Sequence, residues 1–510
     1  MYLVRNILCD YRDRTEPGEL LVRKLHLPAG SLHKYIIQRK SLDARHKNRL
    51  KFNYTLVADI SSQPRHPDVT TYVEPQPYIA IERKIADPHP FIIGSGPAGL
   101  FCALALVEKG LQPVIIEQGD MIDLRSRKVN KFWQEGQLDT QSNVQFGEGG
   151  AGTFSDGKLT TRSRDFYTET IYNYLIRFGA QETIRYESLP HLGTEGLHRI
   201  IKNIRNYLLK NGCEFLFNKK LENVITENQK IKQVRISGEF YSPEIVILAT
   251  GNSARDVFRL LLNKTPLENK PLAVGFRIEH DQDFLNASFY GENTDFEITG
   301  PASYRLTLRY KEKGIYSFCM CPGGYVIGAA TEAKTVVLNG MSYRKRHNQF
   351  GNSALVVTVD EKDYGHGTLS GVIFQQDIER RCFYPEYPFL APVQNAADFN
   401  RHPELNYKPL SSFQPGTVTS DIAALLPTII VKALDFALDQ LEKSYPGFRR
   451  KGLILAPETR TSSPVRIIRN DQRQAESLHN LYPIGEGSGY AGGIISSAAD
   501  GYKTGLIFHN

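Results

Sequence analysis

Residues 88–117 read PHPFIIGSGPAGLFCALALVEKGLQPVIIE, and this stretch decides the fold class. A short apolar strand at 91–93 runs into a glycine-rich turn at 94–99, and the small apolar residues that follow predict a helix. A second apolar strand at 113–116 then ends on Glu117. Strand, glycine turn, helix, strand and terminal acid stand in the order of a dinucleotide-binding βαβ unit.

Each part of this unit has a physical role. Gly94 permits the tight turn, Gly96 lets the backbone approach a pyrophosphate, and Gly99 lets the helix pack against the strand. The helix N-terminus offers unpaired N–H groups to the phosphates, and the Glu117 carboxylate can bind ribose hydroxyls. The predicted cofactor-binding residues of the unit are Gly94, Ser95, Gly96, Pro97, Ala98, Gly99, Glu117 and Gln118.

Two later segments favour FAD over NAD as the cofactor. Residues 245–251 (IVILATG) form an apolar strand that ends in Ala-Thr-Gly, and residues 481–486 (LYPIGE) form one that ends in Gly-Glu before a small-residue helix at 493–501. Both resemble the FAD-binding architecture of the glutathione-reductase type, where a helix N-terminus faces the flavin and stabilises its reduced, anionic form. The residues that this resemblance implies in FAD binding are Ala249, Thr250, Gly251, Gly485, Glu486, Gly492, Gly493 and Ile494.

Composition excludes several protein classes. The 510 residues contain no long uninterrupted apolar window and no signal-peptide pattern, so we expect a soluble, cytoplasmic protein. Six scattered cysteines suit no disulfide framework, and no Cys/His spacing indicates a metal site. The net charge of +7 is concentrated in residues 1–60, which hold 12 Lys and Arg against 6 Asp and Glu.

The chain divides into three predicted parts of an overall α/β protein. Residues 1–83 read as a basic N-terminal α+β module, for which we expect a small ferredoxin-like sandwich. Residues 88–265 plus 450–510 form a Rossmann-type FAD-binding domain that is split in sequence. Residues 266–449 form an inserted substrate or cap domain, which is β-rich at its start and helical over 420–445.

Several dense motifs lie along the chain. They are NVQFGEGGAGTFSDGKL at 143–159, ATGNSARD at 249–256, VGFRIEH at 274–280, YSFCMCPGG at 316–324, NGMS at 339–342, ETRTSSPVR at 458–466 and GEGSGYAGG at 485–493. Together they resemble one family, the uncharacterised FAD-dependent dehydrogenases that are often labelled NAD(FAD)-utilising dehydrogenases. The resemblance runs from about residue 35 to the C-terminus and implies FAD binding and a redox role, but it implies no substrate.

Further cofactor-binding residues follow from position along the chain. The glycine cluster at 147–152 exposes N–H groups and leaves space for a planar ring, which favours contact with the flavin over a surface loop. An arginine after Glu117, Arg125 rather than Arg127, could reach the pyrophosphate. These candidates are Arg125, Gly149, Gly150, Ala151, Gly152, Ser155 and, for backbone contacts to the adenine, Leu221.

Candidate catalytic residues are Lys158, His280, Arg460, Tyr490 and Cys321. Lys158 could stabilise the reduced flavin or simply face solvent, and Arg460 could bind a substrate carboxylate or lock a domain interface. His280 faces the opposite side of a strand from Arg277 and Glu279, and a lone histidine of this kind is more often structural than catalytic. Tyr490 could donate a proton at the flavin ring.

Cys319 and Cys321 are the one close pair of cysteines in the sequence. On a regular strand their Cα atoms would lie about 7 Å apart, at or beyond the limit for a disulfide, whereas a turn before Pro322 could bring them together. They are either small buried apolar groups or a redox pair beside the flavin.

The sequence therefore predicts an FAD-dependent oxidoreductase that passes hydride to or from flavin N5 on a small-molecule substrate. NAD(P)H would bind transiently as an electron donor, because only the GxGxxG at 94–99 stands in a complete strand–helix–strand unit. The alternative is a flavin-containing nucleic-acid-binding or RNA-modifying protein that grips a polyanion through residues 1–60. Neither the substrate nor the oligomeric state follows from the sequence.

Overall fold

The computed structural model describes residues 1–77, 82–161, 165–401, 407 and 409–509. Residues 78–81 of the predicted N-terminal module, 162–164 and 510 of the FAD-binding domain, and 402–406 and 408 of the cap domain lie outside the described residues.

The predicted βαβ unit lies at the centre of a parallel five-stranded sheet in the order β24-β12-β6-β7-β8. The strands are β6 (Phe91–Ile93), β7 (Val114–Glu117), β8 (Glu214–Phe217), β12 (Val246–Leu248) and β24 (Leu481–Pro483). Their apolar residues alternate between two cores, since Ile115 and Ile247 face one side of the sheet and Ile116 and Leu248 the other. The strands expected near 91–93, 113–116, 245–251 and 481–486 are thereby confirmed.

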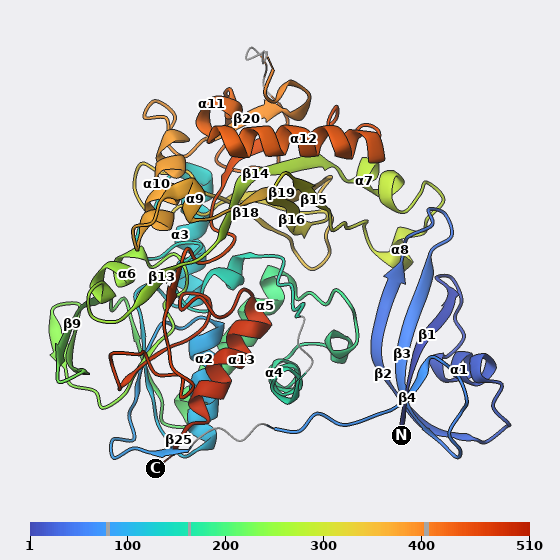
Figure 1. Ribbon diagram of the computed structural model, residues 1–510, viewed down its shortest axis with the longest axis horizontal. Coiled ribbons are helices and arrows are strands. Elements are labelled where there is room, and N and C mark those ends of the chain that lie inside the picture. The colour runs from blue at the N-terminus through green and yellow to red at the C-terminus, as the bar shows by residue number, and fades with distance from the viewer. Residues whose placement is uncertain (78–81, 162–164, 402–406, 408, 510) are drawn as a thin grey trace.

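Helices cover one face of this sheet and a small sheet covers the other. The helical layer contains α2 (Pro97–Glu108), α4 (Phe166–Arg177), α5 (Gly193–Lys210) and α13 (Ile494–Gly505). In Figure 1, α2 and α13 lie side by side although almost 400 residues separate them. The opposite core packs against α6 (Arg255–Leu261) and the antiparallel strands β9 (Leu221–Glu227), β10 (Lys230–Ile236) and β11 (Glu239–Tyr241).

A second sheet of seven strands, in the order β15-β16-β19-β14-β22-β20-β21, lies above the first in Figure 1. Its strands are β14 (Leu272–Asp281), β15 (Thr307–Tyr310), β16 (Lys313–Cys321), β19 (Phe350–Val359), β20 (Ala391–Asn395), β21 (Thr417–Thr419) and β22 (Leu453–Glu458). The helix expected over 420–445 is divided into α11 (Ile422–Leu425) and α12 (Thr428–Ser444), because Pro427 lacks the N–H that a continuous helix needs. Helix α12 covers the outer face of the sheet.

The predicted boundary at residue 450 is wrong by about ten residues. Strand β22 pairs with β14 and β20, so it belongs to the cap sheet and not to the FAD-binding domain. The chain returns through β23 (Val465–Ile467), which pairs with β13 (Leu267–Asn269). The two segments that connect the five-stranded sheet with the seven-stranded sheet, β13 and β23, therefore lie side by side.

Smaller elements complete the two layers. They are β17 (Tyr325–Gly328) paired with β18 (Leu338–Met341), the helices α3 (Ile122–Glu135), α7 (Gln282–Phe289), α8 (Phe296–Thr299), α9 (Glu361–Tyr364) and α10 (Ser370–Arg381), and the 3-10 turns η1 (Ala151–Phe154), η2 (Glu182–Arg185) and η3 (Ala396–Asp398).

The N-terminal residues form a separate antiparallel sheet in the order β2-β3-β1-β4, drawn in blue in Figure 1. Its elements are β1 (Tyr2–Asp10), α1 (Pro17–Leu25), β2 (Leu32–Asp43), β3 (Lys51–Ile60) and β4 (Val69–Thr71). This strand order is that of a ferredoxin-like sandwich, but the described link at 61–68 forms no second helix. Tyr11 and Leu50 share a small core with Tyr290 and Ala302, which fastens the module to the cap.

The strand that follows the N-terminal module and the C-terminal strand of the chain lie side by side at the lower edge of Figure 1. Strand β25 (Phe508–His509) pairs in parallel with β5 (Arg83–Lys84). Among the described residues, no helix combines the length and apolar character needed to cross a membrane.

Candidate functional site

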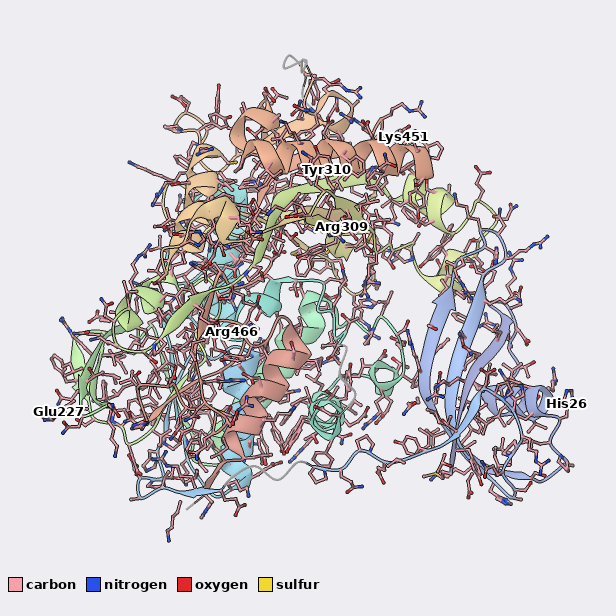
Figure 2. All side chains as sticks on the ribbon, viewed as in Figure 1. His26, Glu227, Arg309, Tyr310, Lys451 and Arg466 are labelled. Atoms are coloured by element: carbon pink, nitrogen blue, oxygen red, sulfur yellow. The ribbon has the colours of Figure 1, made fainter. Side chains whose placement is uncertain are left out.

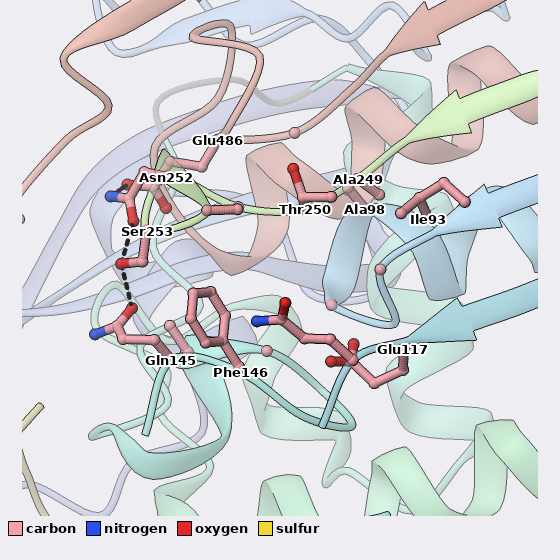
Figure 3. Close-up of a pocket in the computed structure, with 18 of the residues that line it drawn as sticks. Ile93, Ala98, Glu117, Gln145, Phe146, Ala249, Thr250, Asn252, Ser253 and Glu486 are labelled. Carbon is pink, nitrogen blue, oxygen red and sulfur yellow. Dashed lines mark hydrogen bonds between the residues drawn. The ribbon is translucent and has the colours of Figure 1, made fainter. Parts of the chain in front are cut away.

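A pocket opens at the carboxyl ends of the parallel strands, as expected for a doubly wound sheet (Figure 3). It lies where β6 runs into α2 and where the segments after β7, β12 and β24 converge. The predicted cofactor-binding residues that line it are Gly94, Gly96, Pro97, Ala98, Glu117, Gln118, Gly150, Ala151, Gly152, Leu221, Ala249, Thr250, Gly251, Gly485, Glu486, Gly493 and Ile494. Segments far apart in the sequence therefore build one site.

The glycines of the first turn satisfy the roles expected of them. Gly94 has φ +109°, and a Cβ atom there would lie 2.4 Å from the carbonyl oxygen of Ala249. A Cβ on Gly99 would lie 2.0 Å from the carbonyl oxygen of Gly94. At Gly96 a Cβ would meet only the Cα of Gly150, at 3.8 Å, so its open side is the pocket. A backbone this bare can approach a ligand closely.

Two helix N-termini open into the pocket. Helix α2 begins after Gly96 and helix α13 after Gly493, and neither N-cap supplies a side-chain cap. Ala98 and Ile494, in the first turns of the two helices, both line the pocket. Because uncapped N–H groups and the positive ends of two helix dipoles point to one place, the pocket suits an anionic ligand.

Glu117 ties the two glycine loops together. One carboxylate oxygen accepts hydrogen bonds from the N–H and hydroxyl of Ser95, at 3.0 and 2.8 Å, and the other accepts from the N–H groups of Gly119 and Gly147, both at 3.0 Å. The carboxylate is thus occupied by protein donors although the residue lines the pocket. The contact of Glu117 with ribose stays a prediction. In the structure, its hydrogen bonds hold the backbone around Ser95 and Gly147 in place on two sides of the pocket.

Arg125 does not face the pocket, which corrects its assignment to the pyrophosphate. It is fully buried, and its five N–H donors reach the carbonyl oxygens of five residues of the glycine-rich loop. Burial lowers the pKa of Arg125 to about 10, with Glu117 and Glu148 opposing the shift, so the side chain stays charged at neutral pH. It shapes the pocket from behind, and the carbonyls that it bonds are those of Asn143, Val144, Gly147, Glu148 and Gly150.

Five other predicted cofactor-binding residues are absent from the lining of the pocket. Ser95 is buried on Glu117, and Ser155 donates to the carbonyl of Gly152 at 2.7 Å. Gly149 packs against Ile201, and Gly99 packs closely on Gly94. Gly492 is exposed next to the lining residue Gly493.

Residues of two quoted motifs that were not assigned to the cofactor complete one wall. Asn252 donates to a carboxylate oxygen of Glu486 at 3.0 Å, and Ser253 donates to the amide oxygen of Gln145 at 3.2 Å (Figure 3). Phe146 lines the pocket beside them. The signal was present in the sequence, since all four residues lie within the motifs at 143–159 and 249–256.

Glu486 is the acid whose ionisation the pocket perturbs most. Burial raises the pKa of Glu486 to about 7, while Lys270 and the Asn252 amide lower it in part. The carboxyl is therefore largely uncharged in mildly acidic solution. A neutral acid at this place can donate a hydrogen bond to an anionic ligand instead of repelling it.

Two of the five candidate catalytic residues have structural roles. His280 packs between Phe284 and Phe448, and its Nε2 lies 2.7 Å from the carbonyl oxygen of Phe448. Lys451, which is labelled in Figure 2, lies over the same Phe284 ring. Burial lowers the pKa of His280 to about 4. Arg460 is buried against Glu379, which is the interface role that the sequence left open.

Arg460 belongs to a buried ion cluster between the two main layers. Glu379, in α10, accepts from Arg460 at 2.9 Å and from Arg255, in α6, at 2.7 Å. Burial raises the pKa of Glu379, but the two guanidinium groups outweigh that effect and lower it to about 2. The cluster joins α6 beside the pocket to the cap.

The other three candidates lie outside the pocket lining. Tyr490 is 40% exposed, and its ring lies under the guanidinium of Arg469. Lys158 reaches the backbone carbonyl of Met320, and its ammonium lies 4.0 Å from Asp156. Cys321 is buried beside Cys319.

Comparison with known proteins identifies the family. An uncharacterised protein from Clostridium beijerinckii is 38% identical over 498 residues, which cover 95% of this chain and 93% of that protein. The chain belongs to the same family as that protein. Residues 271–461 match a family model described as FAD-dependent protein, C-terminal domain-like, and residues 12–59 match a domain of unknown function.

Several solved structures show a general likeness to this chain. A geranylgeranyl bacteriochlorophyll reductase-like protein from Thermoplasma acidophilum has a TM-score of 0.35 at 12% identity, covering 82% of this chain and 76% of its own. A flavin-dependent brominase has a TM-score of 0.39 at 11% identity, covering 82% and 77%. A probable FAD-dependent monooxygenase from Pseudomonas aeruginosa has a TM-score of 0.33 at 13% identity, covering 81% and 84%. At these TM-scores the likeness carries no argument about activity.

FAD is the cofactor of this family member. The domain match names FAD, and the pocket fits it, because a bare glycine turn and two uncapped helix N-termini meet where a dinucleotide pyrophosphate needs neutralising contacts. The family model begins within five residues of the predicted start of the cap domain, and it ends just after β22.

Proposed function

We propose that this protein is an FAD-dependent oxidoreductase of the kind labelled NAD(FAD)-utilising dehydrogenases, acting on a small-molecule substrate by hydride transfer to or from flavin N5. The observation that carries the proposal is the pair of helix N-termini that open into one pocket. When bound, FAD would supply the hydride-transfer chemistry. The role of the protein would be to bind and orient the cofactor and to neutralise its negative charge.

The lining residues divide this work. The N–H groups around Gly96 and Ala98 would hold the pyrophosphate, and the bare loop at Gly150 would let the cofactor pass close to the backbone. Leu221, at the start of β9, would serve the adenine end. The N-terminus of α13 at Ile494 would stabilise negative charge on the reduced ring.

The substrate would bind between this pocket and the cap sheet. The ion cluster of Arg255, Glu379 and Arg460 would hold the cap at a fixed distance from the cofactor, because each partner is buried and multiply bonded. NAD(P)H, if it is the electron donor, would bind transiently at the same interface.

Anaerobic titration of the holoprotein with NADH and NADPH tests the proposal. Stoichiometric loss of flavin absorbance with one nucleotide supports a pyridine-nucleotide-driven enzyme. Reduction by neither nucleotide, but by a compound from a metabolite library, supports an organic donor. Failure of every two-electron donor to reduce bound FAD overturns the proposed hydride transfer.

A Gly96→Leu variant provides the control for the site. Its Cβ atom fits beside Gly150, and the rest of the side chain extends into the pocket. We expect a folded protein by circular dichroism that no longer binds FAD. Unchanged FAD binding by this variant would place the cofactor elsewhere.

A further inference from the structure

Cys319 and Cys321 come together at an irregularity in the cap sheet. Strand β16 pairs regularly with β19 up to Phe318 and resumes at Cys321 with a shifted register. Cys319 takes the left-handed conformation, with φ +47°, which a residue with a side chain adopts rarely. The two Sγ atoms lie 3.9 Å apart. On a regular strand the Cα atoms of two such residues lie about 7 Å apart, which is at or beyond the limit for a disulfide, so the irregular backbone matters for pairing the thiols.

Two cations hold the backbone between the thiols. The ammonium of Lys158 reaches the carbonyl of Met320, and the guanidinium of Arg277 donates to the carbonyl of Cys319 at 3.0 Å. The same Cys319 carbonyl lies 3.2 Å from the Cys321 sulfur, whose single proton can be donated either to that carbonyl or to the Cys319 sulfur. Lys158 lies six residues after Gly152 of the cofactor pocket, so one short segment links the pocket to the thiol pair.

The surroundings favour a thiolate at Cys319. The hydrogen bond from Cys321 lowers the pKa of Cys319 to about 6, against the opposing effect of burial, with Lys158 and Arg277 adding to the decrease and Asp156 opposing it. The same hydrogen bond and burial raise the pKa of Cys321. Cys319 is partly exposed whereas Cys321 is buried. The sequence prediction named Cys321, but Cys319 has the environment of the attacking thiol.

The remaining cysteines in the described residues differ in each of these respects. Cys9, Cys102, Cys213 and Cys382 are buried, and burial raises the pKa of each thiol. A structural role as small apolar groups explains those four. A structural role does not explain why Cys319 adopts a left-handed backbone conformation that brings its sulfur close to that of Cys321. Nor does it explain why Lys158 and Arg277 both bond the backbone beside the two thiols.

We propose that Cys319 and Cys321 form a redox-active dithiol that reduces disulfide bonds in a small-molecule substrate. The Cys319 thiolate attacks one sulfur of the substrate disulfide, which forms a mixed disulfide and releases the first thiolate, to be protonated by solvent. Cys321 then loses its proton and attacks Cys319, which closes the intramolecular disulfide and releases the second thiol. Two electrons pass from the dithiol to the substrate. The Cys319–Cys321 disulfide must then be reduced again, and this step rests on the proposed oxidoreductase function.

Mass spectrometry of the holoprotein tests the proposal without an activity assay. After exposure to oxidised glutathione and alkylation of free thiols, we expect a peptide with Cys319 and Cys321 joined and the other cysteines alkylated on denaturation. In a Cys321→Ser variant, the Cys319–glutathione adduct should accumulate, because the resolving thiol is gone. A Cys213→Ser variant should behave like the native protein.

Two results would overturn the proposal. One is a native holoprotein whose Cys319 and Cys321 both stay reduced in oxidised glutathione. The other is a Cys321→Ser protein with bound FAD that forms no adduct at Cys319. If Cys321→Ser does not fold, the pH dependence of the rate at which Cys319 is alkylated in the native protein decides instead. A midpoint near pH 6 is expected, and a midpoint near pH 9 would contradict the proposal. Because these readouts do not use NAD(P)H, they separate this proposal from the proposed function.

Discussion

Loss of the Arg125 side chain should disrupt the cofactor pocket more than loss of any exposed arginine nearby. Its guanidinium makes five hydrogen bonds to loop carbonyls, at 2.6 to 3.2 Å, and is fully buried. Among the described residues, the carbonyls of Gly147, Glu148 and Gly150 keep a second donor, whereas those of Asn143 and Val144 would be left without one, at about 1–3 kcal/mol each. Arg125→Met should therefore lose about 2–6 kcal/mol of unfolding free energy.

Two further variants calibrate the effect. Arg125→Lys keeps the charge and has three donors, so it should lose about half as much as Arg125→Met. Arg127→Met, on the same helix and exposed, should change stability by about 0.5 kcal/mol or less. These three variants separate loss of charge, loss of hydrogen bonds and loss of a surface cation.

The assays are urea unfolding of the apoprotein and titration with FAD followed by flavin fluorescence. In Arg125→Met the loop that contributes Gly150 to the pocket must be ordered by FAD itself, so affinity should fall at least about tenfold, equivalent to about 1.4 kcal/mol. The reasoning is refuted if Arg125→Met unfolds at the same urea concentration as Arg127→Met and binds FAD equally well.

Three other perturbations have defined outcomes. Gly501→Ala places a Cβ atom 1.9 Å from the carbonyl of Ala98, so it should force α13 from α2 and lower the melting temperature by several degrees; an unchanged melting curve would contradict this. Glu379→Gln should cost about 3–5 kcal/mol in urea unfolding, because Arg460 loses its buried counter-ion, and near-native stability would refute it. Apoprotein stability should fall as pH rises from about 4.5 to about 7, since folding raises the pKa of Glu486; Glu486→Gln should weaken this fall, and equal slopes would exclude the effect.

The sequence predicted those parts of the site that are contiguous in the chain. The turn at Gly94, the strand before Ala249 and the helix after Gly493 each follow from local spacing, and all of them line the pocket. Such motifs combine a turn geometry with an apolar strand, and both depend on neighbouring residues. The domain match at 271–461 agrees with the expected cofactor.

Long-range partners could not be read from spacing. Arg277 and Glu279 share a strand face, so their spacing alone allows them to pair with each other. In the structure Arg277 pairs with Glu458 at 2.9 Å, and Glu279 accepts hydrogen bonds from Ser412. Each partner lies more than 130 residues away, so only the tertiary fold could reveal it.

The same limit explains the errors at individual residues. Arg125 was predicted to reach the pyrophosphate, but whether a guanidinium faces a ligand or the backbone carbonyls behind it depends on helix orientation. His280 was placed on a strand, but the pattern did not indicate which end of the strand faces the cofactor. The bulge at Cys319 depends on pairing with β19 and is invisible to a strand pattern.

The absorbance spectrum of the purified protein, with chromatographic identification of the released cofactor, tests the central claim most directly. The account predicts flavin bands and the release of FAD, one molecule per chain, either as purified or after incubation with FAD. A protein that shows no flavin bands and takes up no FAD on incubation would contradict it.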